Sequence, residues 1–388
     1  MNVFNYRFFI TLMSKLFSDT IRQPNKPRFK QLFVLFLFSI WFIPQQIFNW
    51  ICFYLDDIFF NSYKKIEVKP LFIIGVPRSG TTFLQRIISK DHAQFTGMSL
   101  WEVCVAPAIC QKYIFLFLGR LDRLFGSSIF QLMANFESWW FKNLHQLHQL
   151  SWFDMEEDEA IFLHQFSSFF LIYLFPYQED FKPYIYYDQE VPYSIRKKQM
   201  EFYKNCVRRH LYVFGPNKSF LSKNPHFCPR IESIMTFLPE SRFILIIRNP
   251  ISTIPSNLSV FQYLCTHLAN VNEGVFKNRT PIFESTMEMI RHWYHYPLTK
   301  LTAYKENRYK ILNYDEFRND PRNEIKRIYH QLDLEYSSVY DQEVKQIMEN
   351  SSRYISRHQY SLVQFGLSKK RILQDFRLIF KRWNFSRK

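Results

Sequence analysis

The stretch 70–82 reads PLFIIGVPRSGTT, and it decides the fold class of this chain. Its first half is an apolar run that predicts a buried strand, and the residues that follow it, 81–90, suit a helix. Between them lie Gly75 and Gly80, two of only eight glycines in 388 residues. A G-x-x-x-x-G spacing between a strand and a helix is typical of a loop that binds phosphate.

This loop has the groups that hold an anion but lacks the lysine of a nucleoside triphosphatase. Glycines let successive backbone N–H groups point inward, and the start of the helix adds its positive dipole end. The candidate anion-binding residues are Arg78, Ser79, Gly80, Thr81 and Thr82. A triphosphatase needs Lys where Thr81 stands, and the cation here is Arg78, whose planar guanidinium suits a compact anion without a magnesium-bridged triphosphate. A kinase or NTPase on the same loop stays open as an alternative.

A second anion-binding site is predicted after the run 242–248, RFILIIR. This run predicts a strand that ends at Arg248, and Ser256 falls early in the helix that follows. The carboxyl ends of strands are where open α/β sheets bind ligands, so Arg248 and Ser256 can converge on one anion. Taken alone, an arginine at a strand end is as often a structural residue as a ligand-binding one. Together with the loop, however, it describes a nucleotide that is phosphorylated at two positions.

The rest of the globular region alternates short strands with long helices. Further strands are predicted at 219–223 and 308–314, and helices at 281–305 and 321–332. Short apolar strands separated by helices favour a parallel sheet that is covered on both faces. The sequence therefore predicts an α/β domain over 66–388.

These motifs together resemble those of sulfotransferases that use 3′-phosphoadenosine 5′-phosphosulfate (PAPS). PRSGTT after a strand is similar to the family's 5′-phosphosulfate loop, and RFILIIRNP with the later serine is similar to its 3′-phosphate motif. The likeness extends over about 70–376, and the branch that it resembles most is the carbohydrate and tyrosylprotein one. Other similar segments are 221–225 (LSKNP), 314–317 (YDEF), 358–361 (HQYS) and 365–367 (FGL). The resemblance implies a P-loop-like domain with a central parallel sheet, PAPS as co-substrate and no metal.

Sulfuryl transfer requires cations around the leaving phosphate and a base for the acceptor hydroxyl. Arg78 lies in the loop, and by resemblance Lys223 faces the transferring group. For the base, the resemblance favours Glu102 in Ser-Leu-Trp-Glu, with His148 as the competing candidate. Each has a structural alternative: Glu102 as a helix cap or surface residue, His148 as part of the core. The acidic run 156–159 either serves the acceptor or the base, or is a solvated helix start.

The segment 32–60 precedes the domain and is strongly apolar, after an N-terminal tail at 1–31. No charge occurs over 32–55, which is long enough to span a membrane, although Pro44 interrupts the run. The segment therefore predicts a membrane anchor or an in-plane membrane helix, with a buried helical hairpin of a soluble protein as the alternative. A signal peptide fits poorly, because no small-residue cleavage site follows.

Charge and composition limit which binding partners are expected. The formal charge of +16 favours anionic ligands, yet no nucleic-acid-binding motif accompanies it. Six scattered cysteines form no Cys-x-x-Cys pair, so no metal site is predicted. The expected acceptor bears a hydroxyl group on a glycan, a lipid or a protein. A non-catalytic nucleotide-binding membrane protein remains the other alternative.

The charges that flank the apolar segment give a location. Basic residues lie within 22–30, before the segment, and Asp56 and Asp57 come directly after its uncharged run 32–55. The positive-inside tendency then leaves the N-terminus in the cytoplasm and places the large domain across the membrane. The sequence predicts a single N-terminal anchor, with the catalytic domain in the Golgi lumen if the source is eukaryotic.

Overall fold

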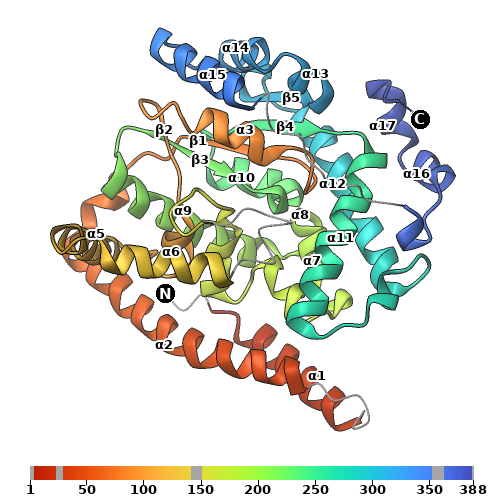
Figure 1. The fold of residues 1–388 in the computed structure, drawn as a ribbon, viewed down its shortest axis with the longest axis horizontal. Coiled ribbons are helices and arrows are strands. Elements are labelled where there is room, and N and C mark those ends of the chain that lie inside the picture. Colours follow the sequence, from red (N-terminus) through yellow and green to blue (C-terminus); the bar gives the residue numbers. More distant parts are fainter. Residues whose placement is uncertain (1–3, 23–28, 141–150, 352–361, 387–388) are drawn as a thin grey trace.

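The computed structural model describes residues 4–22, 29–140, 151–351 and 362–386, and at its centre lies a parallel sheet (Figure 1). The order of its five strands is β2-β3-β1-β4-β5. The strands are β1 (Pro70–Ile74), β2 (Phe95–Thr96), β3 (Ser219–Lys223), β4 (Arg242–Ile247) and β5 (Tyr309–Asn313). The parallel sheet and its four longer strands confirm the predictions, whereas the two-residue β2 was not predicted.

The strand order brings three carboxyl ends together. β1 pairs with β3 on one side and with β4 on the other, with Ile73 opposite Lys223 and Ile74 opposite Leu245. The loop after β1, the end of β3 and the end of β4 therefore lie next to one another. This is the edge at which α/β sheets with reversed strand order bind ligands.

Side chains alternate between the two faces of β1, and each face is covered. Leu71 and Ile73 belong to one apolar cluster, whereas Phe72 and Ile74 belong to the other. One face is covered by α3 (Thr81–Ile88), α14 (Pro321–Gln331) and α15 (Ser338–Ser351). The other is covered by α9 (Tyr193–Phe214), α10 (Ile231–Phe237), α11 (Pro250–Ala269) and α12 (Pro281–Leu301). A strand buried on both faces is expected to be apolar throughout, as β1 is.

The N-terminal segments are helices that pack on the body. α1 (Tyr6–Arg22) lies within the predicted tail, and Leu12 and Leu16 are buried in the main core. α2 (Phe29–Phe59) runs unbroken through Pro44, where the sequence predicts an interruption. A proline inside a helix removes one backbone hydrogen bond. Buried residues on both sides of Pro44, among them Phe42 and Asn49, hold the two halves against the body as one helix.

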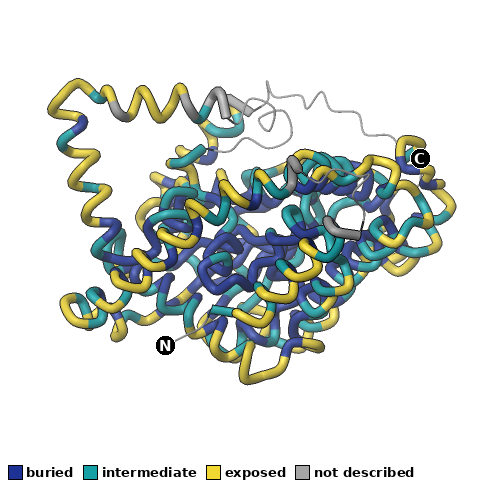
Figure 2. Tube along the Cα trace, turned by 90° about the horizontal axis from the view of Figure 1, so that it is seen from below, coloured by how far each residue is buried: buried dark blue, intermediate teal, exposed yellow. Residues whose placement is uncertain are grey.

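The remaining elements surround the ligand-binding edge or lie at the periphery. Those near the edge are α4 (Leu100–Cys104), η2 (Asp158–Gln165), η3 (Phe169–Tyr173), η4 (Pro225–Arg230) and α13 (Tyr314–Asn319). The others are η1 (Asn61–Lys65), α5 (Ile109–Leu124), α6 (Ser128–Trp140), α7 (Gln178–Ile185), α8 (Tyr187–Glu190), η5 (Glu273–Phe276), η6 (Glu306–Arg308), η7 (Val363–Phe365), α16 (Lys369–Asp375) and α17 (Arg377–Trp383). Figure 2, seen from the side on which α2 lies in Figure 1, shows the buried residues gathered in the body and the exposed ones along the outer helices.

Candidate active site

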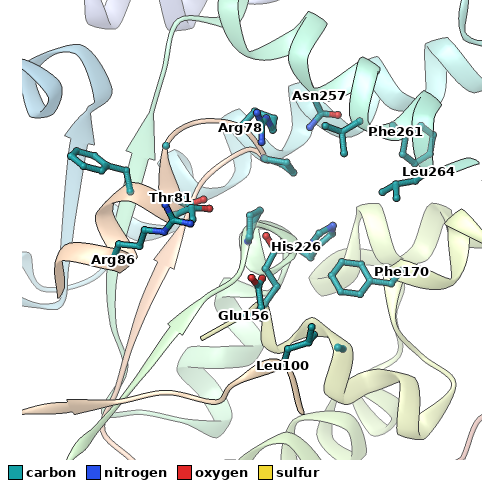
Figure 3. A pocket seen from close by; sticks show the side chains of 18 of the residues that line it. Arg78, Thr81, Arg86, Leu100, Glu156, Phe170, His226, Asn257, Phe261 and Leu264 are labelled. Carbon is teal, nitrogen blue, oxygen red and sulfur yellow. Dashed lines mark ion pairs between the residues drawn. The ribbon is translucent and has the colours of Figure 1, made fainter. Parts of the chain in front are cut away.

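A cavity of about 1840 Å³ opens at the carboxyl edge of the sheet (Figure 3). Its polar lining comes from the loop after β1 and the start of α3, from the residues just before η2, from the start of η4, from the end of β4 and from α11. These residues include Arg78, Gly80, Thr81, Thr82, Glu156, Glu157, His226, Arg248 and Asn257. Figure 3 shows Arg78 and Thr81 on one side of Glu156 and His226, with the apolar Phe170 and Leu264 on the other. The cavity therefore has a polar end and an apolar end.

The loop after β1 has the strained backbone of a phosphate cradle. Gly80 has a φ of +102°, and a side chain there would collide with the ring of Tyr314. Arg78 also has a positive φ, +73°, which is unfavourable for a residue with a Cβ. The Ser79 hydroxyl is fully buried, and it has no hydrogen-bond partner within the described residues. An anion held by this loop would supply the missing partner, and it would have to reach a side chain that does not itself line the cavity.

The structure brings the two predicted anion sites into direct contact. The Nε of Arg78 donates to the hydroxyl of Ser256 at 3.0 Å, and Nη1 of Arg248 donates to the Arg78 carbonyl at 3.0 Å. The Arg248 guanidinium lies over the ring of Tyr314 at 4.4 Å, and the Tyr294 hydroxyl donates to the Arg248 carbonyl at 2.8 Å. The loop and the end of β4 thus form one basic site.

Lys223 ends β3 next to this site but is buried beneath two carboxylates. Its ammonium donates to Oε1 of Glu157 at 2.9 Å and lies 3.9 Å from Oε2 of Glu156. Only 1% of the lysine side chain is exposed. Both glutamates line the cavity, and Lys223 does not. Lys223, the predicted cation, therefore contacts Glu156 and Glu157 from the protein interior, on the side away from the cavity.

The two glutamates differ in their surroundings. Glu157 has a second neighbour, His226, whose Nδ1 lies 3.4 Å from Oε2. Burial raises the pKa of Glu156 to about 7, since the attraction of Lys223 only partly offsets it and the negative charge of Glu157 adds to it. A carboxyl with a pKa near neutrality can exchange a proton with a substrate at physiological pH.

The other two acids of the run 156–159 point into the protein. Asp158 accepts hydrogen bonds from the Ser222 hydroxyl at 2.9 Å and from the Asn224 amide at 3.0 Å. Glu159 accepts from Nη2 of Arg230 at 3.2 Å. These bonds attach the start of η2 to the end of β3 and to η4, so that the two preceding glutamates are held at the cavity. None of the four is a solvated helix residue.

Glu102 lies outside the cavity lining, contrary to what a base would require. Its carboxylate accepts from the amide and the hydroxyl of Ser99, both at 3.0 Å, and caps α4. Nδ1 of His210 lies at 2.8 Å and the Lys112 ammonium at 3.5 Å. Burial alone would raise the pKa of Glu102, but His210 and Lys112 lower it to about 2. The competing candidate, His148, lies outside the described residues.

Replacing Glu102 with glutamine is expected to destabilise the fold, because His210 and Lys112 would lose a buried negative partner. The free energy of unfolding should fall by about 3 kcal/mol in urea titrations at pH 7. Because the folded pKa lies below the ordinary 4.5, the wild type should lose this stabilisation as the pH falls from about 4.5 toward 2. Glu67→Gln, on an exposed pair with Lys69, is the control. Equal stability of the two variants would contradict a structural role.

Two parts of the site were not foreseen. His226 comes three residues after Lys223 and Asn257 directly follows Ser256, so proximity to the predicted residues was the available signal. The apolar end is lined from α2, η3 and α11, including Trp41. Elements this distant in sequence are brought together by tertiary packing. All six cysteines are free, and the described residues contain no group of three His, Cys, Asp or Glu that could hold a metal.

Comparisons with known proteins agree with this geometry. A model of the sulfotransferase family matches residues 70–338. "Omega-hydroxy-beta-dihydromenaquinone-9 sulfotransferase Stf3" from Mycobacterium bovis and from Mycobacterium tuberculosis are each 25% identical over 293 residues, 74% of this chain and 68% of theirs. Sulfotransferase STF9 from Mycobacterium avium has a similar fold, with a TM-score of 0.64, 16% identity, and coverage of 86% of this chain and 82% of that one. STF1 from Mycobacterium tuberculosis gives a TM-score of 0.58 and 18% identity over 81% and 78%.

Proposed function

Because the chain belongs to the sulfotransferase family, we propose that it transfers a sulfuryl group from PAPS to a hydroxyl of a lipid. The observation that carries the proposal is the joined basic site formed by Arg78, Arg248 and Ser256 beside the glycine loop. A nucleotide with phosphates at both its 5′ and 3′ positions matches two anion sites in contact. The absence of a lysine after Gly80 argues against a triphosphatase.

The donor's two ends would have separate holders. The loop residues 79–82 would bind the 5′ phosphosulfate through backbone N–H groups, with the Ser79 hydroxyl finding there the partner that it lacks. Arg248 and Ser256 would bind the 3′-phosphate. Arg78 contacts both Ser256 and Arg248. It would lie near the oxygen that bridges phosphate and sulfate, and would stabilise the negative charge that develops there.

For the acceptor proton we propose Glu156 instead of Glu102. Glu156 lines the cavity and has a pKa of about 7, whereas Glu102 is enclosed by Ser99, His210 and Lys112. In the step, the bond between sulfur and the donor's phosphate oxygen breaks as a bond from the acceptor oxygen to sulfur forms. The hydroxyl proton goes to Glu156, and adenosine 3′,5′-bisphosphate leaves. His148 remains the second candidate for the base.

The apolar end of the cavity favours a lipid acceptor over a glycan or a peptide. Phe170, Leu174, Phe261 and Leu264 line it and offer apolar contacts to the body of an acceptor. The relatives from mycobacteria carry the name of a menaquinone-derivative sulfotransferase, which agrees with an apolar acceptor. We propose that the apolar segment 32–60 attaches the domain 66–388 to a membrane. The prediction of a Golgi location, which held only for a eukaryotic source, gains no support from relatives that are bacterial.

Incubation of the purified chain with PAPS labelled in its sulfuryl group tests this function. The host's lipids, glycans and proteins would be offered as separate fractions, and the label should appear in the lipid fraction. Label in glycan or protein would contradict the acceptor class. Donor binding without transfer to any fraction would favour the non-catalytic alternative, and hydrolysis of ATP with magnesium would favour the NTPase.

Replacing Arg248 with alanine is expected to weaken binding of adenosine 3′,5′-bisphosphate by roughly 30-fold, since a charged hydrogen bond contributes about 2 kcal/mol. Binding of AMP, which lacks the 3′-phosphate, should change by less than about threefold on the same scale. Calorimetry with both nucleotides measures the difference. Arg242→Ala, at the opposite end of β4, is the matched control. An equal loss of affinity for both nucleotides would mean that Arg248 only supports the loop and does not bind the 3′-phosphate.

A further inference from the structure

The polarity of α2 differs from that of a surface helix of a soluble protein, because its exposed face is apolar and its buried face carries polar residues beside the apolar Leu35 and Phe42. Gln46, Asn49 and Asp56 are buried against the body, where such a helix normally carries apolar residues. We define the outer face of α2 as its exposed apolar side chains Phe33, Phe36, Ile40, Ile43, Ile47 and Ile51. Phe36 is 60% exposed and Ile47 is 52% exposed. An uncharged apolar face of this length is typical of contact with lipid.

Buried polar bonds fix α2 to the body. Asp56 accepts from Nε of Arg209 at 2.9 Å and from the backbone amide of Ile109 at 2.8 Å. Asn49 accepts from the side-chain amide of Gln111 at 2.7 Å. Separating Asp56 from Arg209 would leave two buried charges without their partner, which strongly destabilises a protein. The helix is therefore held along the body.

This attachment bears on how α2 meets a membrane. Leu32–Phe59 is long and apolar enough to span a bilayer by length and composition. A spanning helix would have lipid on all sides, yet the face of α2 from Leu35 to Asp56 is covered by protein. A bilayer can therefore meet only the outer face, with the helix axis along the membrane plane.

The outer face is continuous with the active-site cavity. Val34, Leu37, Phe38 and Trp41 of α2 line the cavity whose other end holds the glycine loop. Two of them also reach the outside, since Leu37 is 48% exposed and Trp41 is 45% exposed. These two side chains form a rim between the cavity and the surface that we assign to lipid.

The helices α1 and α5 also expose apolar side chains, and α5 exposes positive charge. α1 exposes Ile10 and Phe17, and α5 exposes Phe117. On α5, Arg120 and Arg123 are exposed as well. Bases beside an apolar face attract the head groups of anionic lipids.

We propose that the outer face of α2 lies in one leaflet of a bilayer, and that the lipid acceptor enters the cavity sideways from that leaflet, past Leu37 and Trp41. The docking surface stands on the geometry of α2 alone. The entry route rests on the proposed function, because it requires a lipid acceptor. The hydroxyl end would reach the glutamates while the chain stays among apolar side chains.

Flotation of the full chain with vesicles of three parts phosphatidylcholine to one part phosphatidylglycerol tests the docking surface. The wild type is expected to float, and Ile40→Glu with Ile47→Glu should lower the partition coefficient at least tenfold. Val339→Glu, on the exposed α15 at the opposite end of the molecule in Figure 1, should leave it unchanged. Flotation of the double variant equal to the wild type would overturn the proposal, as would a stable dimer that buries this face and does not float.

Quenching of tryptophan fluorescence gives a second readout without charged substitutions. Trp41 and Trp50 are both exposed on α2. Lipids brominated near the head group should quench the wild type, and most of this quenching should disappear in Trp41→Phe with Trp50→Phe. Quenching that persists in full in the double variant would place another surface on the membrane and overturn the assignment.

A substitution at the cavity wall tests sideways entry. Val34→Trp should raise KM for a long hydroxylated isoprenoid in vesicles about tenfold relative to a short soluble analogue, while Ile47→Trp on the outer face should not. An unchanged ratio of the two KM values would overturn the route. If the chain floats but transfers no label, the proposed function fails and the docking surface stands.

Discussion

Arg78→Ala is expected to lower the rate of sulfuryl transfer by roughly 10³-fold. Arg78 lines the cavity, donates to Ser256, and accepts through its carbonyl from Arg248. It therefore lies where the loop and the 3′ site meet, close to the charge that develops as the leaving phosphate departs. Single-turnover measurements with saturating PAPS separate this effect from donor binding.

Alanine at position 78 also changes the residue at a strained backbone position, and the chain offers a matched control. Arg279 has a φ of +72°, nearly equal to the +73° of Arg78, but is exposed in a loop away from the cavity. Arg279→Ala should therefore reproduce any effect of alanine at positive φ without affecting transfer. Arg78→Lys should retain part of the rate, since lysine keeps the charge but loses the planar donor pair. Full activity of Arg78→Ala would remove this residue from the chemistry.

Glu156→Gln is expected to reduce transfer by about 10³-fold while leaving binding of the bisphosphate nucleotide intact. The glutamine amide cannot take the proton from the acceptor hydroxyl. Glu156 is also not among the residues that we propose to bind the donor. In the wild type, kcat should rise with pH through about 7 as Glu156 ionises. The residual activity of the variant should lack this limb.

Two further variants assign the base if Glu156 is not it. Glu201→Gln, exposed on α9, should behave as the wild type. Glu102→Gln should retain its rate per folded molecule despite its lower stability. Loss of the pH limb in Glu102→Gln, with Glu156→Gln unaffected, would return the base to the position that the sequence favoured. If both variants keep the limb, His148 becomes the base to test.

The parts of the fold that follow from local pattern were predictable. The glycine spacing in 75–80 requires a turn between strand and helix, and the apolar run 242–248 has no other place than the inside of a sheet. Arg248 could be placed beside the loop because parallel strands end at one edge of a sheet. The structure confirms this sheet and puts Arg248 in contact with Arg78.

The parts that depend on distant contacts were not predictable. Glu102 is surrounded by Lys112 from α5 and His210 from α9, and no pattern in Ser-Leu-Trp-Glu indicates them. Likewise the run 156–159 divides between the cavity and the interior because Ser222 and Asn224, at the end of β3, hold Asp158.

For α2 a signal was present in the sequence. Gln46, Asn49 and Asp56 lie three and seven residues apart, which places them on one face of a helix. The pattern was easy to miss, because apolar residues such as Leu35 and Phe42 also occupy buried positions beside the few polar ones. The polar residues identify the side that meets protein, so the apolar remainder faces outward.

Calorimetry of the wild type with adenosine 3′,5′-bisphosphate and with AMP tests the central claim, that one joined basic site holds both phosphates of the donor. The bisphosphate is expected to bind at least about 30-fold more tightly than AMP, as a charge-assisted contact to Arg248 requires. Equal affinity for the two nucleotides would contradict the assignment of the donor, and the proposed transfer would then lack its sulfuryl source.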